Sequence, residues 1–191
     1  MTAYKMKLQP IAPESAERAA KPIMEEAQKN LGMVPNLYRN MANVPELLET
    51  YTAGYQGFRK HSGFTSAEQE VVLLSVSFEN ACTYCMAVHS FMADRMSGVP
   101  EEVTNALREG REIPDPKLRV LSELTREVVR TRGRPSEEGV RAFLDAGYEE
   151  SQILHVLLAV AVKTISNYTN HLFETPVDEP FQVRAWQPPQ K

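Results

Sequence analysis

Cysteine is scarce in this sequence: the only two among its 191 residues are Cys82 and Cys85. Two cysteines in a chain of this size exclude a scaffold stapled by disulfides. In a reducing compartment, a close cysteine pair is more often catalytic or metal-binding than structural. This pair is therefore the first candidate for chemistry.

Long apolar runs and dense positive charge are also missing. The longest apolar run spans residues 156–162, far fewer than the ~20 residues that a membrane span needs. The chain does not open with a signal-peptide pattern. Its formal net charge of −4 and the lack of Lys and Arg clusters disfavour a nucleic-acid partner. We predict a cytoplasmic protein that binds neither membranes nor nucleic acids.

Hairpin signals are absent, whereas helix start and stop signals recur along the chain. Thr65 and Glu68 form a capping box before an apolar segment without Gly or Pro. At about fourteen residues, that segment is too long for a typical strand. Similar signals predict further helices, among them residues 19–31, 117–131 and 149–173. The predicted fold class is all-α, as a single domain over residues 1–191.

The two ends of the chain are the least regular parts. Residues 1–18 are predicted to form an N-terminal arm whose order depends on a partner. Residues 175–191 contain four prolines and the only tryptophan, Trp186, and are predicted to form an extended tail. Phe181 and Trp186 indicate that this tail packs against the rest of the protein.

A shift of 82 residues aligns the cysteine segment with the last predicted helix. It places Cys82 on Thr164 and His89 on His171, with a similar apolar pattern between them. One interpretation is a duplicated helical hairpin in which only the first copy kept its chemistry. The alternative is that two buried helices share a pattern.

Cys82, Cys85 and His89 would share one face of a single helix, at positions i, i+3 and i+7. Helical Cα atoms three residues apart are ~5 Å from each other, within the range that a disulfide bridges. The thiolate is the reactive form of cysteine, and a helix N-terminus alone lowers a thiol pKa by less than about one unit. His89 is therefore the predicted base.

Two carboxylates are candidates for orienting His89. Glu70 lies inside a mostly apolar segment, where an unpaired charge is costly. The alternative interpretation is that Glu70 lies on a narrow solvent-exposed stripe of this helix. Glu79 lies three residues before the first cysteine, and the sequence leaves the choice open. Tyr84 and Glu79 are also predicted to lie at the substrate pocket, Tyr84 as a wall.

A metal site is the main alternative use of these side chains. Cys82, Cys85 and His89 could supply three zinc ligands, with a carboxylate as the fourth. The usual structural zinc site joins two ligand pairs from separate segments, and the chain has no second pair. We predict neither a metal nor a cofactor.

The pattern Glu70, Cys82-x-x-Cys85-x-x-x-His89 resembles the alkylhydroperoxidase D-like family of the carboxymuconolactone decarboxylase superfamily. Residues 32–48 are similar to the peroxidase-related branch of that family. The resemblance implies an all-helical, duplicated, homo-oligomeric fold, as a trimer or hexamer.

The resemblance also implies an activity, thiol-dependent reduction of hydroperoxides with an external dithiol or thiol-disulfide protein as reductant. It implies that Cys85 attacks the peroxide, Cys82 resolves the product as a disulfide, and Glu70 with His89 relays the proton. Helix-dipole reasoning instead makes Cys82 the more acidic thiol. The rival functions are a decarboxylase-type enzyme, although such members lack the cysteine pair, and a non-enzymatic redox sensor.

Overall fold

The computed structural model describes residues 3–189, in which nine α-helices and two 3₁₀-helices form and no strand does. The all-α prediction is confirmed. The outermost residues of the predicted arm and tail, 1–2 and 190–191, lie outside the described residues. The α-helices are α1 (Ala20–Leu31), α2 (Asn36–Met41), α3 (Pro45–His61), α4 (Ser66–Glu79), α5 (Thr83–Arg95), α6 (Glu101–Glu109), α7 (Pro116–Arg130), α8 (Glu137–Asp145) and α9 (Glu150–Phe173). The 3₁₀-helices are η1 (Pro13–Ser15) and η2 (Glu179–Arg184).

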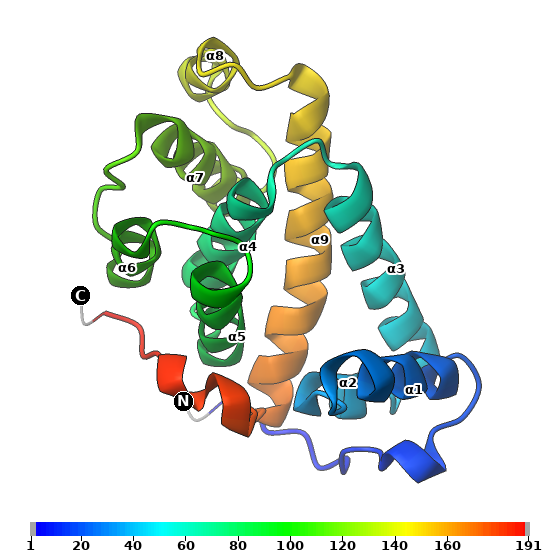
Figure 1. Cartoon of the computed structure of the whole chain (residues 1–191). Coiled ribbons are helices and arrows are strands. Elements are labelled where there is room, and N and C mark those ends of the chain that lie inside the picture. The colour runs from blue at the N-terminus through cyan, green and yellow to red at the C-terminus, as the bar shows by residue number, and fades with distance from the viewer. Residues whose placement is uncertain (1–2, 190–191) are drawn as a thin grey trace.

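Helix α4 lies at the centre of the bundle and packs against α5, α6, α7 and α9 (Figure 1). Its start is fixed by the predicted capping box, in which Glu68 N donates to Thr65 Oγ1 at 3.2 Å and Thr65 N donates to Glu68 Oε2 at 2.8 Å. Every residue from 68 to 77 is buried. A helix that is apolar around its circumference can be covered on all sides in this way.

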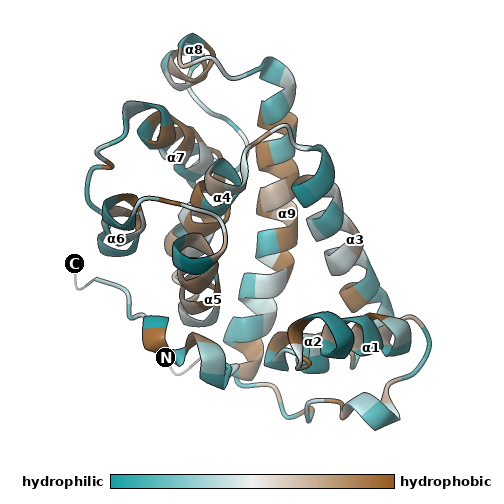
Figure 2. Ribbon diagram, viewed as in Figure 1, coloured by the Kyte–Doolittle hydropathy of each residue, from teal (hydrophilic) through white to brown (hydrophobic). Residues whose placement is uncertain are grey.

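The long helix α9 changes character along its length. In Figure 2 its first half is mainly brown and its second half shows more teal and white, beside α5. The 82-residue shift maps both α4 and α5 onto this single helix. None of the helices in residues 3–189 combines the length and apolar character needed to cross a membrane.

Buried apolar side chains form two clusters. One centres on α4 and α7 and includes Leu73 and Leu121. The other joins α1, α2 and α3 to the start of α5 and contains both cysteines. The cysteine pair therefore lies where the N-terminal helices meet the central bundle.

A sharp break separates α4 from α5, a point that the sequence left open. Ala81 has a left-handed φ of 51°, and Cys82 is extended, with φ −84° and ψ 102°. Cys82 is thus the N-cap of α5 and lies outside its helical turns. The expectation that both cysteines and His89 share one helix face is wrong for Cys82, and holds only for Cys85 and His89, which are one turn apart in α5.

The C-terminal tail packs on the bundle, as predicted. Trp186 Nε1 donates to Arg108 O at 2.7 Å, and the Phe181 ring meets the edge of Phe91 with centroids 5.4 Å apart. The tail is not extended throughout, because η2 (Glu179–Arg184) forms within it.

The N-terminal arm contacts its own chain. Met6 N donates to Leu172 O at 2.7 Å, and Ile11 N donates to Arg39 O at 2.9 Å. These backbone hydrogen bonds attach the arm to α9 and α2.

Two glycines of α3 provide a matched test of the packing that places α9. A Cβ atom at Gly54 would lie 2.6 Å from Val162 Cγ1. At Gly57 the nearest atom, Leu158 Cδ2, would be 3.9 Å away. We expect Gly54→Ala to lower the free energy of unfolding by ~1–3 kcal/mol, because buried valine is stiff at χ1. Gly57→Ala should raise it by up to ~1 kcal/mol.

Urea unfolding of both variants beside the wild type measures these changes. Equal and stabilising effects at the two positions would show that α3 does not press on α9 at Gly54.

Candidate active site

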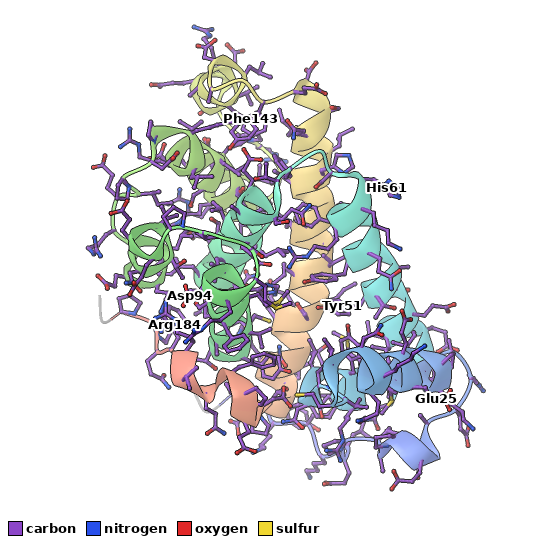
Figure 3. The ribbon with its side chains drawn as sticks, viewed as in Figure 1. Glu25, Tyr51, His61, Asp94, Phe143 and Arg184 are labelled. Atoms are coloured by element: carbon purple, nitrogen blue, oxygen red, sulfur yellow. The ribbon has the colours of Figure 1, made fainter. Side chains whose placement is uncertain are left out.

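The two cysteines lie at the N-terminus of α5, facing α9, and Figure 3 shows sulfur atoms between these two ribbons. Cys82 is 0% exposed and Cys85 is 2% exposed. Cys85 N donates to Cys82 Sγ at 3.4 Å, so the first sulfur caps the helix that carries the second. Asn170 Nδ2 lies 3.3 Å from Cys85 Sγ and 3.8 Å from Cys82 Sγ. One amide of α9 therefore contacts both sulfurs.

Glu70 is the carboxylate that contacts His89. His89 Nδ1 lies 2.9 Å from Glu70 Oε2, and the other oxygen of this fully buried carboxylate accepts from Arg59 Nη2. Glu79 points elsewhere, since its Oε1 pairs with Arg126 Nε at 2.6 Å. Of the two candidate carboxylates, Glu70 and not Glu79 therefore contacts His89, because the central helix α4 directs Glu70 toward α5.

Arg59 is held in place by three further contacts. Its Nη2 donates to Tyr55 Oη at 2.6 Å, and its Nη1 donates to Gln69 Oε1 at 3.1 Å. Gln69 Nε2 in turn donates to Arg59 O at 3.0 Å. This network ties α3 to the start of α4 and keeps the guanidinium on Glu70.

The charges of Glu70 and His89 follow from these contacts. Burial raises the pKa of Glu70, but His89 and Arg59 outweigh it and lower the pKa below its usual value. Burial and the charge of Lys163 lower the pKa of His89 against the opposing effect of Glu70. Glu70 is therefore a carboxylate facing a neutral imidazole, with the proton on Nδ1 and the lone pair on Nε2.

Lys163 of α9 is a fully buried lysine beside the cysteines. Its Nζ has no hydrogen-bond partner among the described residues, and its charge acts on Cys85, Cys82 and His89. A buried ammonium group is costly unless an opposite charge lies near it. A thiolate at Cys85 provides that charge.

The two thiols consequently differ in acidity. Burial raises the pKa of Cys85, but hydrogen bonding to Cys82 and the nearby charge of Lys163 outweigh the effect of burial and hold the pKa well below its usual value. Hydrogen bonding to Cys85 and burial raise the pKa of Cys82. These shifts favour Cys85 as the thiolate and Cys82 as the protonated thiol, opposite to the order that helix-dipole reasoning gives.

Sequence reasoning missed the contribution of α9. Lys163, Ser166 and Asn170 are spaced i, i+3 and i+7 and face the cysteines from one side of the helix. Ser166 Oγ lies 3.8 Å from Cys85 Sγ. A lysine directly after the apolar run 156–162, followed by polar residues at helical spacing, was the available signal.

Tyr84 and Glu79, the two predicted pocket residues, have polar atoms that are engaged elsewhere. Tyr84 Oη donates to Asp178 Oδ2 at 2.5 Å, and Asp178 Oδ1 accepts from Asn36 N at 3.1 Å. Asp178 therefore fastens the tail to α5 through Tyr84 and to α2 through Asn36. Glu79 pairs with Arg126, as described above.

A metal ion would need several ligands in one place. Within residues 3–189, no three His, Cys, Asp or Glu side chains are arranged to hold one. His89 uses Nδ1 for Glu70, and the sulfurs contact Asn170. The contacts observed at these side chains are those of a thiol site.

Replacing Lys163 by methionine tests whether its charge is held for the thiol. We expect Lys163→Met to raise the free energy of unfolding by ~1 kcal/mol or more, because Cys85 then takes up a proton and neither charge of the buried pair remains. The same change should raise the pKa of Cys85 and slow its alkylation by iodoacetamide at pH 6.

The control is Lys60→Met, at an exposed position of α3. It should change the free energy of unfolding by less than about 0.5 kcal/mol and leave the alkylation of Cys85 unchanged. Unfolding in urea and mass spectrometry of the alkylated cysteine are the measurements. A less stable Lys163→Met variant with unaltered alkylation would contradict the pairing.

Glu70→Gln tests the buried ion pair with Arg59. Breaking such a pair should lower the free energy of unfolding by ~3 kcal/mol at pH 7. Because folding lowers the pKa of Glu70, its contribution is present above the unfolded value of about 4.3 and is lost as pH falls through the folded value. The difference from the wild type should therefore shrink below about pH 4.

The matched variant is Glu79→Gln, which breaks the more exposed pair with Arg126. It should lower the free energy of unfolding by about 1 kcal/mol or less. Urea unfolding at pH 7 and at pH 3 gives both comparisons. An equal cost for the two variants, or a Glu70→Gln cost that ignores pH, would rule out this assignment.

Residues 45–129 match the carboxymuconolactone decarboxylase family. This stretch runs from α3 to α7 and includes Glu70, Cys82, Cys85 and His89. Comparison with curated proteins found no match to the chain.

Solved structures share the fold over nearly the whole chain. The alkylhydroperoxidase AhpD core protein of Ralstonia eutropha JMP134, a peroxidase-related protein, is 19% identical with a TM-score of 0.77, over 94% of this chain and 100% of its own. A peroxidase-related protein of Silicibacter sp. TM1040 is 22% identical with a TM-score of 0.78, over 95% and 97%. A cysteine-to-alanine variant of the debrominase Bmp8, in complex with 2,3,4-tribromopyrrole, is 14% identical with a TM-score of 0.76, over 94% and 96%.

At these identities the structures establish the fold, and the family match covers the segment that contains the cysteine pair. Both agree with the resemblance seen in the sequence. The chain therefore has an alkylhydroperoxidase D-like fold, and its residues 45–129 match the carboxymuconolactone decarboxylase family.

Proposed function

We propose that the protein reduces organic hydroperoxides with the Cys82–Cys85 pair and is regenerated by an external dithiol. One observation supports this most strongly: Cys85 Sγ contacts Asn170 and lies beside the buried charge of Lys163, next to a protonated Cys82. A stabilised thiolate adjacent to a second thiol is the arrangement that peroxide reduction requires.

In the first step, the Cys85 thiolate attacks the terminal oxygen of the hydroperoxide. The S–O bond forms as the O–O bond breaks, so the sulfur is oxidised to a sulfenic acid and the peroxide is reduced. The alkoxide that leaves takes up a proton and departs as an alcohol. Lys163 and Asn170 are the cationic and polar groups nearest the developing negative charge.

In the second step, Cys82 resolves the sulfenic acid. Its sulfur attacks Cys85 Sγ, the S–S bond forms, and the hydroxyl leaves with the Cys82 proton as water. Both sulfurs already contact the same Asn170 amide, so little movement is needed. A dithiol then reduces the disulfide by exchange and restores the starting state.

His89 and Glu70 would serve as the proton relay. The carboxylate fixes the proton on Nδ1, so Nε2 can take up a proton from solvent and pass it to the departing alkoxide, and can then carry the Cys82 proton to the departing hydroxide. His89 lies one turn after Cys85 on the same face of α5, within reach of the chemistry.

A second candidate is reductive debromination of an aromatic compound by the same pair. The similar fold of Bmp8, whose cysteine variant binds 2,3,4-tribromopyrrole, favours it. Two thiols and a carbon–bromine bond would give a carbon–hydrogen bond, bromide, a proton and a disulfide. Release of bromide from a bromopyrrole in the presence of a dithiol measures this activity.

A dithiol or thiol-disulfide protein as reductant fits a reducing, cytoplasmic setting. We also propose that the protein is a homo-oligomer, a trimer or hexamer, as is usual for the fold it resembles. Sedimentation equilibrium would measure that state.

Peroxide consumption with dithiothreitol tests the proposal. Wild type should consume tert-butyl hydroperoxide, and Cys85→Ser should lose at least about a thousandfold of the rate because the nucleophile is gone. Cys82→Ser should stop after one turnover and retain a sulfenic acid that dimedone traps. Glu70→Gln should slow the reaction about a hundredfold, whereas Glu79→Gln should not.

The rival functions predict different results. A decarboxylase-type enzyme would keep its activity in the double variant Cys82→Ser with Cys85→Ser. A redox sensor would form the disulfide without turnover by any dithiol. Equal peroxide consumption by the wild type and Cys85→Ser would overturn the proposal.

A further inference from the structure

A reactant reaches the buried sulfurs only by passing a layer of side chains. Tyr51 and Tyr55 of α3 form such a layer on one side of the site. The Tyr55 and His89 ring centroids lie 6.4 Å apart, and Tyr51 stacks on Tyr55 at 5.9 Å. Tyr51 also lies close enough to Cys85 for the thiolate to raise its pKa, after burial and the neighbouring tyrosines Tyr38 and Tyr55.

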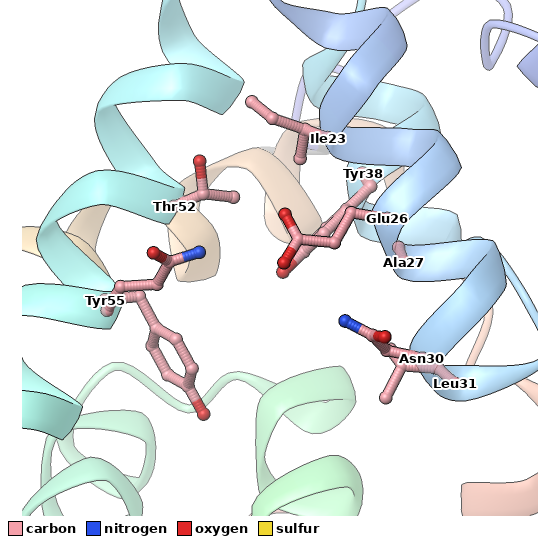
Figure 4. A pocket seen from close by; sticks show the side chains of 9 residues that line it. Ile23, Glu26, Ala27, Asn30, Leu31, Tyr38, Thr52 and Tyr55 are labelled. Carbon is pink, nitrogen blue, oxygen red and sulfur yellow. The ribbon is translucent and has the colours of Figure 1, made fainter.

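A cavity of about 190 Å³ lies on the other side of this layer, between α1 and α3 (Figure 4). Tyr55 and Tyr38 line it, and the Tyr38 ring meets the edge of Tyr51 with centroids 6.1 Å apart. In Figure 4 the Tyr55 ring points away from Ile23 and Thr52, toward the green ribbons. Tyr55 is therefore a wall shared by the cavity and the site.

The lining defines the chemistry of a ligand. Ile23, Ala27 and Leu31 of α1 provide an aliphatic wall. The exposed rim of the cavity carries the polar side chains of Glu26, Asn30 and Gln56. The volume is below the ~300 Å³ of typical drug-sized sites, which favours a small ligand. The Glu26 carboxylate disfavours a ligand that is itself an anion.

We propose that this cavity admits and binds a small, neutral organic hydroperoxide, which reaches Cys85 past Tyr55. The apolar body of the substrate would lie against α1 and its hydroperoxide group would point toward Tyr55. The identity of the substrate rests on the proposed function, whereas the route to the sulfur does not.

Filling the cavity tests the route. Gln56→Trp from α3 and Asn30→Trp from α1 place an indole in the cavity from opposite walls, at exposed positions. Each should raise the KM for tert-butyl hydroperoxide about tenfold with kcat nearly unchanged. Each should also slow iodoacetamide alkylation of Cys85 about tenfold. Lys60→Trp, exposed on α3 outside the cavity, should match the wild type in both measurements.

The two readouts separate the possible failures. If the wild type reduces no peroxide but the cavity variants alkylate slowly, the route stands and the proposed function fails. If the folded cavity variants behave like Lys60→Trp in both measurements, the route is overturned. Thermal melting identifies a variant that does not fold. In that case the variant on the opposite wall of the cavity tests the route to Cys85.

Glu26→Gln tests the preference for neutral substrates. The wild type should show a higher KM for a carboxylate-bearing hydroperoxide than for tert-butyl hydroperoxide, and the variant should reduce that ratio about fivefold. If the ratio of the two KM values is the same in Glu26→Gln as in the wild type, Glu26 does not disfavour anionic substrates.

Discussion

The site depends on opposite charges held together where water is excluded. Lys163 is buried without a hydrogen-bond partner among the described residues, and a buried ammonium costs several kcal/mol unless a negative charge lies near it. In our proposal, Cys85 supplies that charge as a thiolate. The same electrostatics keeps the thiol ionised and makes the lysine tolerable, so neither residue can be understood alone.

A second charge pair completes the balance. Arg59 compensates Glu70, and the charge of Lys163 helps to keep His89 neutral. In the proposed reaction, oxidation of Cys85 to a disulfide removes the thiolate and leaves Lys163 without its opposite charge. This loss disfavours the oxidised form and therefore favours its reduction by a dithiol.

Much of the fold could be predicted from the sequence, because helix ends have local chemical signals. The capping box at Thr65 and Glu68 and the long apolar segment after it were sufficient for α4. The cysteine motif and the cost of burying an unpaired carboxylate also identified the candidate residues of α4 and α5, which are Glu70, Cys82, Cys85 and His89. The break at Ala81 was not predictable, because a left-handed alanine lacks the glycine that usually marks such a turn.

The α9 side of the site escaped prediction for a different reason. Lys163 and Asn170 lie about eighty positions from the cysteines in the chain, and only packing brings them together. Arg59 likewise reaches Glu70 through the docking of α3 on α4. Side chains that meet through tertiary contacts leave a weak local pattern, which here was a lysine at the end of an apolar run.

The central claim is that Cys85 is a thiolate at neutral pH. Thiolate absorbance at 240 nm, followed from pH 4 to pH 10 in the Cys82→Ser variant, measures it directly with Cys85 as the only thiol. We expect the absorbance of one thiolate per chain to be present already at pH 7 and to disappear only under acidic conditions. A thiolate that forms only above about pH 8.5, as in an unperturbed cysteine, would contradict it.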